Sequence, residues 1–82
     1  MNRDYLLWHL KEAKEELDRT IVEIENSNDY DIGEYLVAMS HLYHHVNTAW
    51  NAKNASIEEA TECSEENFQK WRKFPAESEL LL

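Results

Sequence analysis

The chain contains very few of the residues that form tight turns. Its 82 residues include one glycine and one proline, whereas sheet proteins with many strands need such residues at most of their turns. The same scarcity excludes the glycine-rich loops that bind phosphates in P-loop and dinucleotide-binding proteins. The sequence therefore predicts an all-α protein without a nucleotide site of either kind.

Cysteine is equally scarce. Cys63 is the one cysteine of the sequence, which excludes an internal disulfide and a zinc site built from paired cysteines. Glu62, Glu65 and Glu66 lie close to it in sequence, and their negative charge disfavours the thiolate that a nucleophile requires. No serine stands in the Gly-x-Ser-x-Gly turn of a hydrolase. We expect a cytoplasmic protein and find no nucleophile that indicates an enzyme.

Positive charge is also in short supply. Eight Lys and Arg residues stand against 17 Asp and Glu residues, which gives a net charge of -9 at pH 7. Such a chain is repelled by phosphate backbones and by anionic lipid surfaces, so we expect neither nucleic acid nor membrane as a partner. The first residues lack the order of charges and apolar residues that marks a secretory signal, which agrees with a cytoplasmic location.

Helical periodicity is what the sequence does contain, in three segments. Over residues 4–25 apolar side chains recur at spacings of three and four, which is typical of an amphipathic helix. A second helix is predicted over 32–53, where Asp31 and Glu34 form a capping signal, with Tyr30 placed to pack on Tyr35. A third is predicted over 57–74, and Ser56 with Glu59 marks its start. A tail of residues 75–82 begins at the proline, which stops the helix.

The short connections between these segments favour one domain over residues 1–82, folded as a three-helix bundle that runs up, down and up. The second helix has a wide apolar arc, which suggests two neighbours. An alternative is therefore that two chains pair through this helix and complete the core as a homodimer, because small scaffolds often need such support.

The most distinctive stretch is residues 35–52, which holds no Asp, Glu, Lys or Arg. His41, His44 and His45 are its titratable groups near neutral pH. They fall beside the apolar stripe of the second helix and form a ridge. His41 and His45 are four residues apart, the spacing at which two imidazoles on one helix face bind the same metal ion.

Carboxylates from the first helix are expected to face this ridge. If the first two helices fold back as a hairpin about Asn28, Glu12 and Glu16 come level with His45 and His41. Three interpretations stay open: imidazoles hydrogen-bonded at a helix interface, a divalent transition metal held by His41, His45, Glu12 and Glu16, and an acid-base site. The first of these requires no cofactor.

Two side chains are candidates for binding another protein. Trp8 falls off the main apolar stripe of its helix, so it either anchors a partner or packs against the third helix. His44 of the ridge is the other candidate. With no assembled nucleophile, base and orienting group, the sequence predicts a self-associating interaction or regulatory module that binds a protein partner without catalysis.

Overall fold

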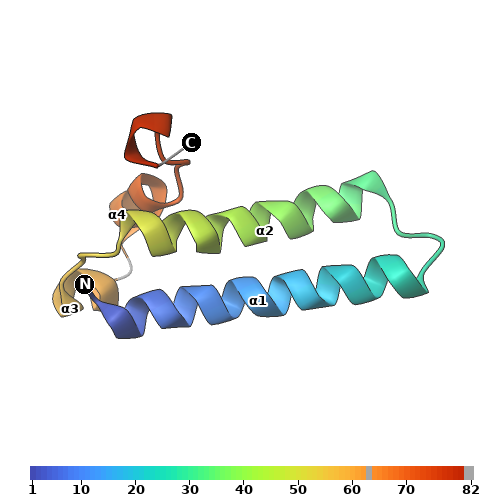
Figure 1. The fold of residues 1–82 in the computed structure, drawn as a ribbon, viewed down its shortest axis with the longest axis horizontal. Helices are drawn as coiled ribbons and strands as arrows, with labels where there is room; N and C mark the ends of the chain where they lie inside the picture. Colours follow the sequence, from blue (N-terminus) through green and yellow to red (C-terminus); the bar gives the residue numbers. More distant parts are fainter. Residues whose placement is uncertain (63, 81–82) are drawn as a thin grey trace.

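The computed structural model describes residues 1–62 and 64–80, and in these the protein is built from helices alone (Figure 1). Helix α1 (Arg3–Asn26) and helix α2 (Ile32–Asn51) form a long antiparallel hairpin. Two short helices, α3 (Ile57–Glu62) and α4 (Glu65–Trp71), lie at the end of the hairpin where the chain begins, and a 3₁₀ turn, η1 (Glu77–Glu79), follows. The predicted all-α class is confirmed.

The helix starts follow the capping signals of the sequence. The Asp31 carboxylate accepts a hydrogen bond of 2.9 Å from the backbone N–H of Glu34, and the rings of Tyr30 and Tyr35 pack 6.5 Å apart between centroids. Ser56 and Glu59 exchange reciprocal hydrogen bonds of 3.0 and 3.1 Å between side chain and backbone. Both predicted caps are present because they satisfy backbone donors that have no partner inside the helix.

The structure differs from the single helix expected over residues 57–74. Helix α3 ends at Glu62, and Ser64 caps a separate helix α4 by accepting a hydrogen bond of 3.1 Å from the backbone N–H of Asn67. A serine side chain can compete for backbone hydrogen bonds in this way and interrupt a helix. Helix α4 then ends at Trp71, earlier than expected. Cys63 and the last two leucines of the predicted tail lie outside the described residues.

Two asparagines near the end of α2 hold α4 in place. The side-chain amide of buried Asn47 donates to the carbonyl oxygen of Arg72 at 3.0 Å. The amide of Asn51 donates to the carbonyls of Trp71 and Lys73 at 2.8 and 2.6 Å. The last carbonyls of a helix have no intrahelical donor, so these amides satisfy them and fix α4 against α2.

The hairpin itself has a core of small side chains. Its buried apolar residues are Ala13, Ala38, Ala49 and Ala52, and the one large buried apolar side chain of the described part is Trp71 on α4. Several larger apolar side chains of the two helices lie along one side of the hairpin and not between the helices. We call this surface the apolar band, which consists of Leu10, Leu17, Ile21 and Ile24 of α1 with Tyr35, Met39 and Val46 of α2.

Except for half-buried Met39, every residue of the apolar band is substantially exposed. The alanines between α1 and α2 allow the two helices to pack through a neighbouring face, which leaves the residues of the apolar band to one side. Within residues 1–62 and 64–80, no helix combines the length and the apolar character needed to cross a membrane.

Candidate metal centre

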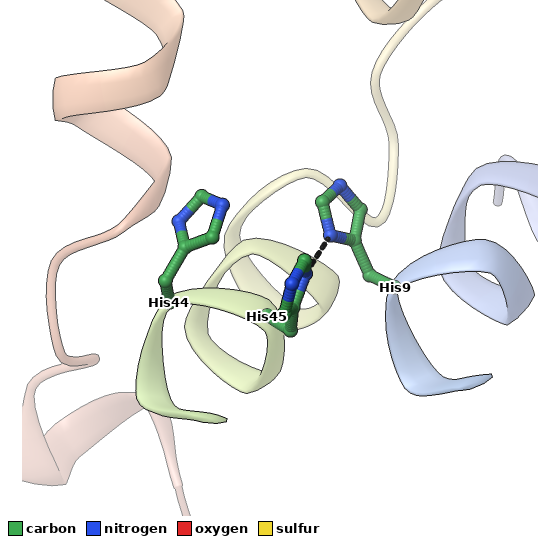
Figure 2. A group of neighbouring side chains, drawn as sticks. All are labelled: His9, His44 and His45. Carbon is green, nitrogen blue, oxygen red and sulfur yellow. Dashed lines mark hydrogen bonds between the residues drawn. The ribbon is translucent and has the colours of Figure 1, made fainter. Parts of the chain in front are cut away.

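Three histidines meet where α1 packs against the second half of α2. His9 comes from α1, and His44 and His45 come from adjacent positions on α2 (Figure 2). One ring nitrogen from each lies within 4.8 Å of the others. The Nδ1 atoms of His9 and His45 are hydrogen-bonded at 3.0 Å, so one of the two rings carries its proton on that atom. We refer to these residues as the histidine cluster.

Aromatic side chains fix the orientation of the imidazoles. Tyr5 and Trp8, both on α1, pack edge-on against the His9 ring with centroids 4.7 and 4.9 Å away. Phe68 of α4 packs against His44 at 4.9 Å. The two contacts of His9 are edge-to-face and that of His44 is tilted. Such ring contacts favour particular orientations, so α1 and α4 hold the histidine cluster from two sides.

A pocket of about 430 Å³ opens beside the histidine cluster. His9 and His44 form part of its wall, and the remaining lining is mostly apolar and aromatic, from Tyr5, Trp8, Thr48, Ala60, Ser64, Asn67, Phe68 and Trp71. His9 is only 4% exposed, and its Nε2 atom is buried without a hydrogen-bond partner among the described residues. A buried polar nitrogen without a partner is costly, and this one belongs to a side chain that lines the pocket.

Burial lowers the pKa of all three imidazoles. The pKa of His9 falls from 6.5 to about 4, mainly because burial penalises the charged ring and also because His45 and His44 are close. Burial is likewise the largest cause of the lowered pKa of His44 and of His45, although the carboxylates of Glu12 and Glu16 act against it at His45. At neutral pH the rings are therefore mostly uncharged and keep a nitrogen lone pair.

We expect the metal-free chain to lose stability as the pH falls below about 6.5. In this range His9 is protonated in the unfolded chain but stays neutral in the folded chain, because its folded pKa is lower. The contribution of His9 is complete above pH 6.5 and declines until the folded pKa of about 4 is reached. After allowance for solvent screening, the loss at pH 5 is about 1 to 2 kcal/mol in the free energy of unfolding.

Chemical denaturation at pH 7.5 and pH 5.0 measures this loss. The titratable groups that act on His9 are His45 and His44, and the carboxylate of Glu12 acts in turn on His45. Carboxylates elsewhere also titrate in this range, so the comparison is made with His9→Gln, which should show a smaller decline than the wild type. Equal declines in the wild type and His9→Gln would contradict the expectation.

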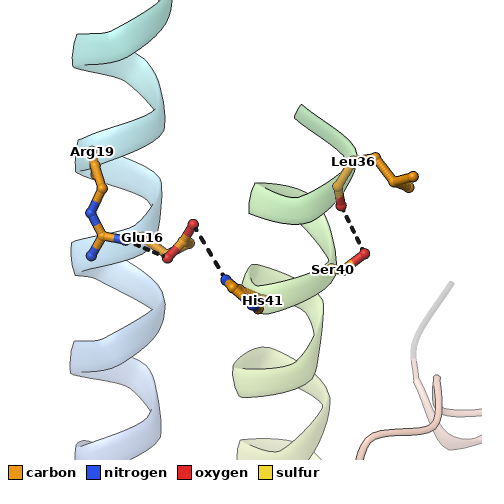
Figure 3. A network of polar contacts seen from close by, with 5 residues as sticks. All are labelled: Glu16, Arg19, Leu36, Ser40 and His41. Atoms are coloured by element: carbon orange, nitrogen blue, oxygen red, sulfur yellow. Dashed lines mark hydrogen bonds and ion pairs between the residues drawn. The ribbon is translucent and has the colours of Figure 1, made fainter. Parts of the chain in front are cut away.

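The structure separates the residues that the sequence grouped as metal ligands. His41 lies apart from the histidine cluster, with its side chain 62% exposed and its Nδ1 atom 4.0 Å from a carboxylate oxygen of Glu16. The carboxylate of Glu16 also pairs with the guanidinium of Arg19 at 2.8 Å (Figure 3). Next to His41 on α2, the hydroxyl of Ser40 donates to the backbone carbonyl of Leu36 at 2.7 Å. His45 is brought together with His9 and His44, and Glu12 acts on it as a neighbouring charge.

His9 was not predicted from the sequence as part of the site. A signal was present, since His9, Glu12 and Glu16 follow one another at spacings of three and four and so share a helix face. The hairpin register that placed Glu16 beside His41 also brings that face of α1 to α2. Of the two residues proposed for protein binding, His44 belongs to the histidine cluster, whereas Trp8 is 54% exposed at the rim of the pocket. Their role in protein binding stays a prediction.

The geometry suits a transition metal ion. Neutral imidazoles are good ligands for zinc, copper, nickel and iron, whereas magnesium and calcium prefer oxygen. With zinc–nitrogen bonds of about 2.0 to 2.1 Å, two ligands of a tetrahedral site lie about 3.3 Å apart. The Nδ1 atoms of His9 and His45 are already 3.0 Å apart. Side-chain rotations that bring the third nitrogen closer, from within 4.8 Å, would complete three-fold coordination.

Comparisons of the chain with protein-family models, with curated proteins and with solved structures find no match. The functional assignment therefore depends on the chemistry of the site itself.

Proposed function

We propose that this protein binds a divalent transition metal ion, with zinc as the first choice, through His9, His44 and His45. The observation that carries the proposal is the convergence of three imidazoles from two helices, with one ring nitrogen from each within 4.8 Å of the others. The pKa of His9 supports ligation over proton transfer, because a group with a pKa of about 4 is a weak base at neutral pH.

The surroundings of the histidine cluster favour an open site. Three protein ligands leave at least one coordination position of a zinc ion for water or another ligand, as in catalytic zinc sites. The adjoining pocket of about 430 Å³ gives such a ligand room. A bound metal would supply Lewis acidity there, while the aromatic side chains of the lining would exclude bulk water and hold an apolar ligand.

Direct metal titration of the full chain, prepared without affinity histidines, tests the proposal. We expect one Zn²⁺ per chain at pH 7.5, with a dissociation constant at or below about 1 µM. Co²⁺ should give the visible absorption of a nitrogen-ligated ion and should be displaced by Zn²⁺. Mg²⁺ serves as the control and should not compete, because it prefers oxygen ligands. A chain that shows no saturable Zn²⁺ binding in this titration would refute the proposal.

A further inference from the structure

The apolar band is a feature of the molecule that the histidine cluster does not explain. At about 100° per residue, its α1 members fall about 60° to 120° around the helix from His9, and its α2 members about 80° to 120° around from His45. His9 and His45 face each other, and the helices are antiparallel (Figure 1). Residues at equal angles from these two histidines therefore lie on the same side of the hairpin. The two rows form one continuous surface.

The short helices cover a different side. Trp8 lies about 100° from His9, and His44 about 100° from His45, both in the direction away from the apolar band. On that side Phe68 of α4 packs on His44. The contacts that define the register, His9 with His45 and His41 with Glu16, bring Leu10 level with Val46 and Leu17 level with Met39. The apolar band is thus a matched double row that α3 and α4 leave uncovered.

The exposed area of the chain indicates how much surface is uncovered. The structure exposes 6361 Å², whereas a compact monomer of this mass exposes roughly 5,200 Å². The excess, roughly 1,200 Å², exceeds the area of about 800 Å² that each partner contributes to an interface of standard size. The buried apolar side chains of the hairpin are all alanines, and none of its large apolar residues is fully buried within the described part of the chain.

We propose that a second copy of this chain covers the apolar band, so that two hairpins form a four-helix bundle. The charge pattern favours this occupant over a charged foreign helix. At about 100° per residue, every Asp and Glu of α1 and α2 falls outside the apolar band. Two such faces therefore meet without opposed carboxylates, although the chain carries a net charge of -9. A self-complementary face that pairs with itself is the ordinary geometry of a two-fold dimer.

Sedimentation equilibrium of the full chain tests this proposal with two matched valines of α2. Val46, 43% exposed, belongs to the apolar band, and Val37, 55% exposed, lies outside it. We expect the wild type to be a dimer at micromolar concentrations and Val37→Glu to remain one. Val46→Glu should weaken dimerisation by about 100-fold or more, because it buries a charge without a partner.

Circular dichroism of each variant shows whether its helices are retained. If Val46→Glu loses helix, Leu17→Glu on α1 takes its place, with the same expected loss of dimer. His44→Ala, on the other side of the hairpin, should leave the dimer intact, so that this proposal and the metal proposal fail independently. A monomeric wild type would overturn the pairing and assign the apolar band to a helix of another protein. A species larger than a dimer, or equal dissociation of Val37→Glu and Val46→Glu, would also overturn it.

Discussion

Replacing His44 or His45 by alanine is expected to weaken zinc binding by about 100-fold or more. Loss of a residue that merely orients a ligand costs about 10- to 100-fold in metal affinity, so loss of a ligand itself should reach at least the upper end of that range. Each variant leaves two imidazoles of the histidine cluster. Competition between the protein and a chromophoric chelator, read at pH 7.5, measures the change.

His41→Ala is the matched control for this experiment. It removes the same chemical group from the same helix, but His41 is exposed and pairs with Glu16 outside the histidine cluster. Its zinc affinity should stay within about threefold of the wild type, the ordinary scatter of an indirect effect. If His41→Ala weakens binding as strongly as His45→Ala does, the ligand set is the one expected from the sequence, which combines His41, His45, Glu12 and Glu16.

His9→Gln adds a second readout. His9 is buried and its Nδ1 atom is hydrogen-bonded to His45, so its replacement also changes the packing of the hairpin. Co²⁺ separates the two effects, because the ligand field of the bound ion reports the number of nitrogen ligands. A His9→Gln variant that still binds Co²⁺ with an unchanged spectrum would show that His9 is not a ligand.

Local signals in the sequence account for most of the fold. The caps at Asp31 and Ser56 and the periodicity of the two long segments are encoded within a few residues, and the structure follows them. The break between α3 and α4 is also local, since Ser64 caps α4. It was missed because a serine on one face of a regular helical pattern is compatible with an unbroken helix.

The packing face and the composition of the site were harder to predict, because both depend on how one helix is rotated against another. Ala13 and Leu17 are four residues apart and so lie only about 40° from each other around α1, and a rotation of about that size decides which of them faces α2. The wide apolar arc of α2 allowed either arrangement. The same rotation decides that His45 meets His9 while His41 meets Glu16. The pairing of Asn47 and Asn51 with carbonyls at the end of α4 was equally non-local.

Trp71→Ala is expected to have the largest effect on stability. Trp71 is 5% exposed and is the one large apolar side chain buried within the described residues, with its ring 6.0 Å from that of Tyr5. Truncation of a buried tryptophan costs about 3 to 5 kcal/mol. For a chain of 82 residues, total stability is roughly 4 to 12 kcal/mol, so this loss removes a large part of it. Urea denaturation at a fixed protein concentration measures the change.

Trp8→Ala is the control of matched chemistry, because Trp8 also lines the pocket but is 54% exposed. Its loss should cost about 1 kcal/mol, in keeping with the smaller apolar area it buries. Trp71→Ala should weaken zinc binding as well, since α4 supplies the Phe68 contact that holds His44. If both variants lower stability equally, Trp71 does not anchor α4. If Trp71→Ala retains full zinc affinity, the two helices of the hairpin are sufficient to assemble the metal site.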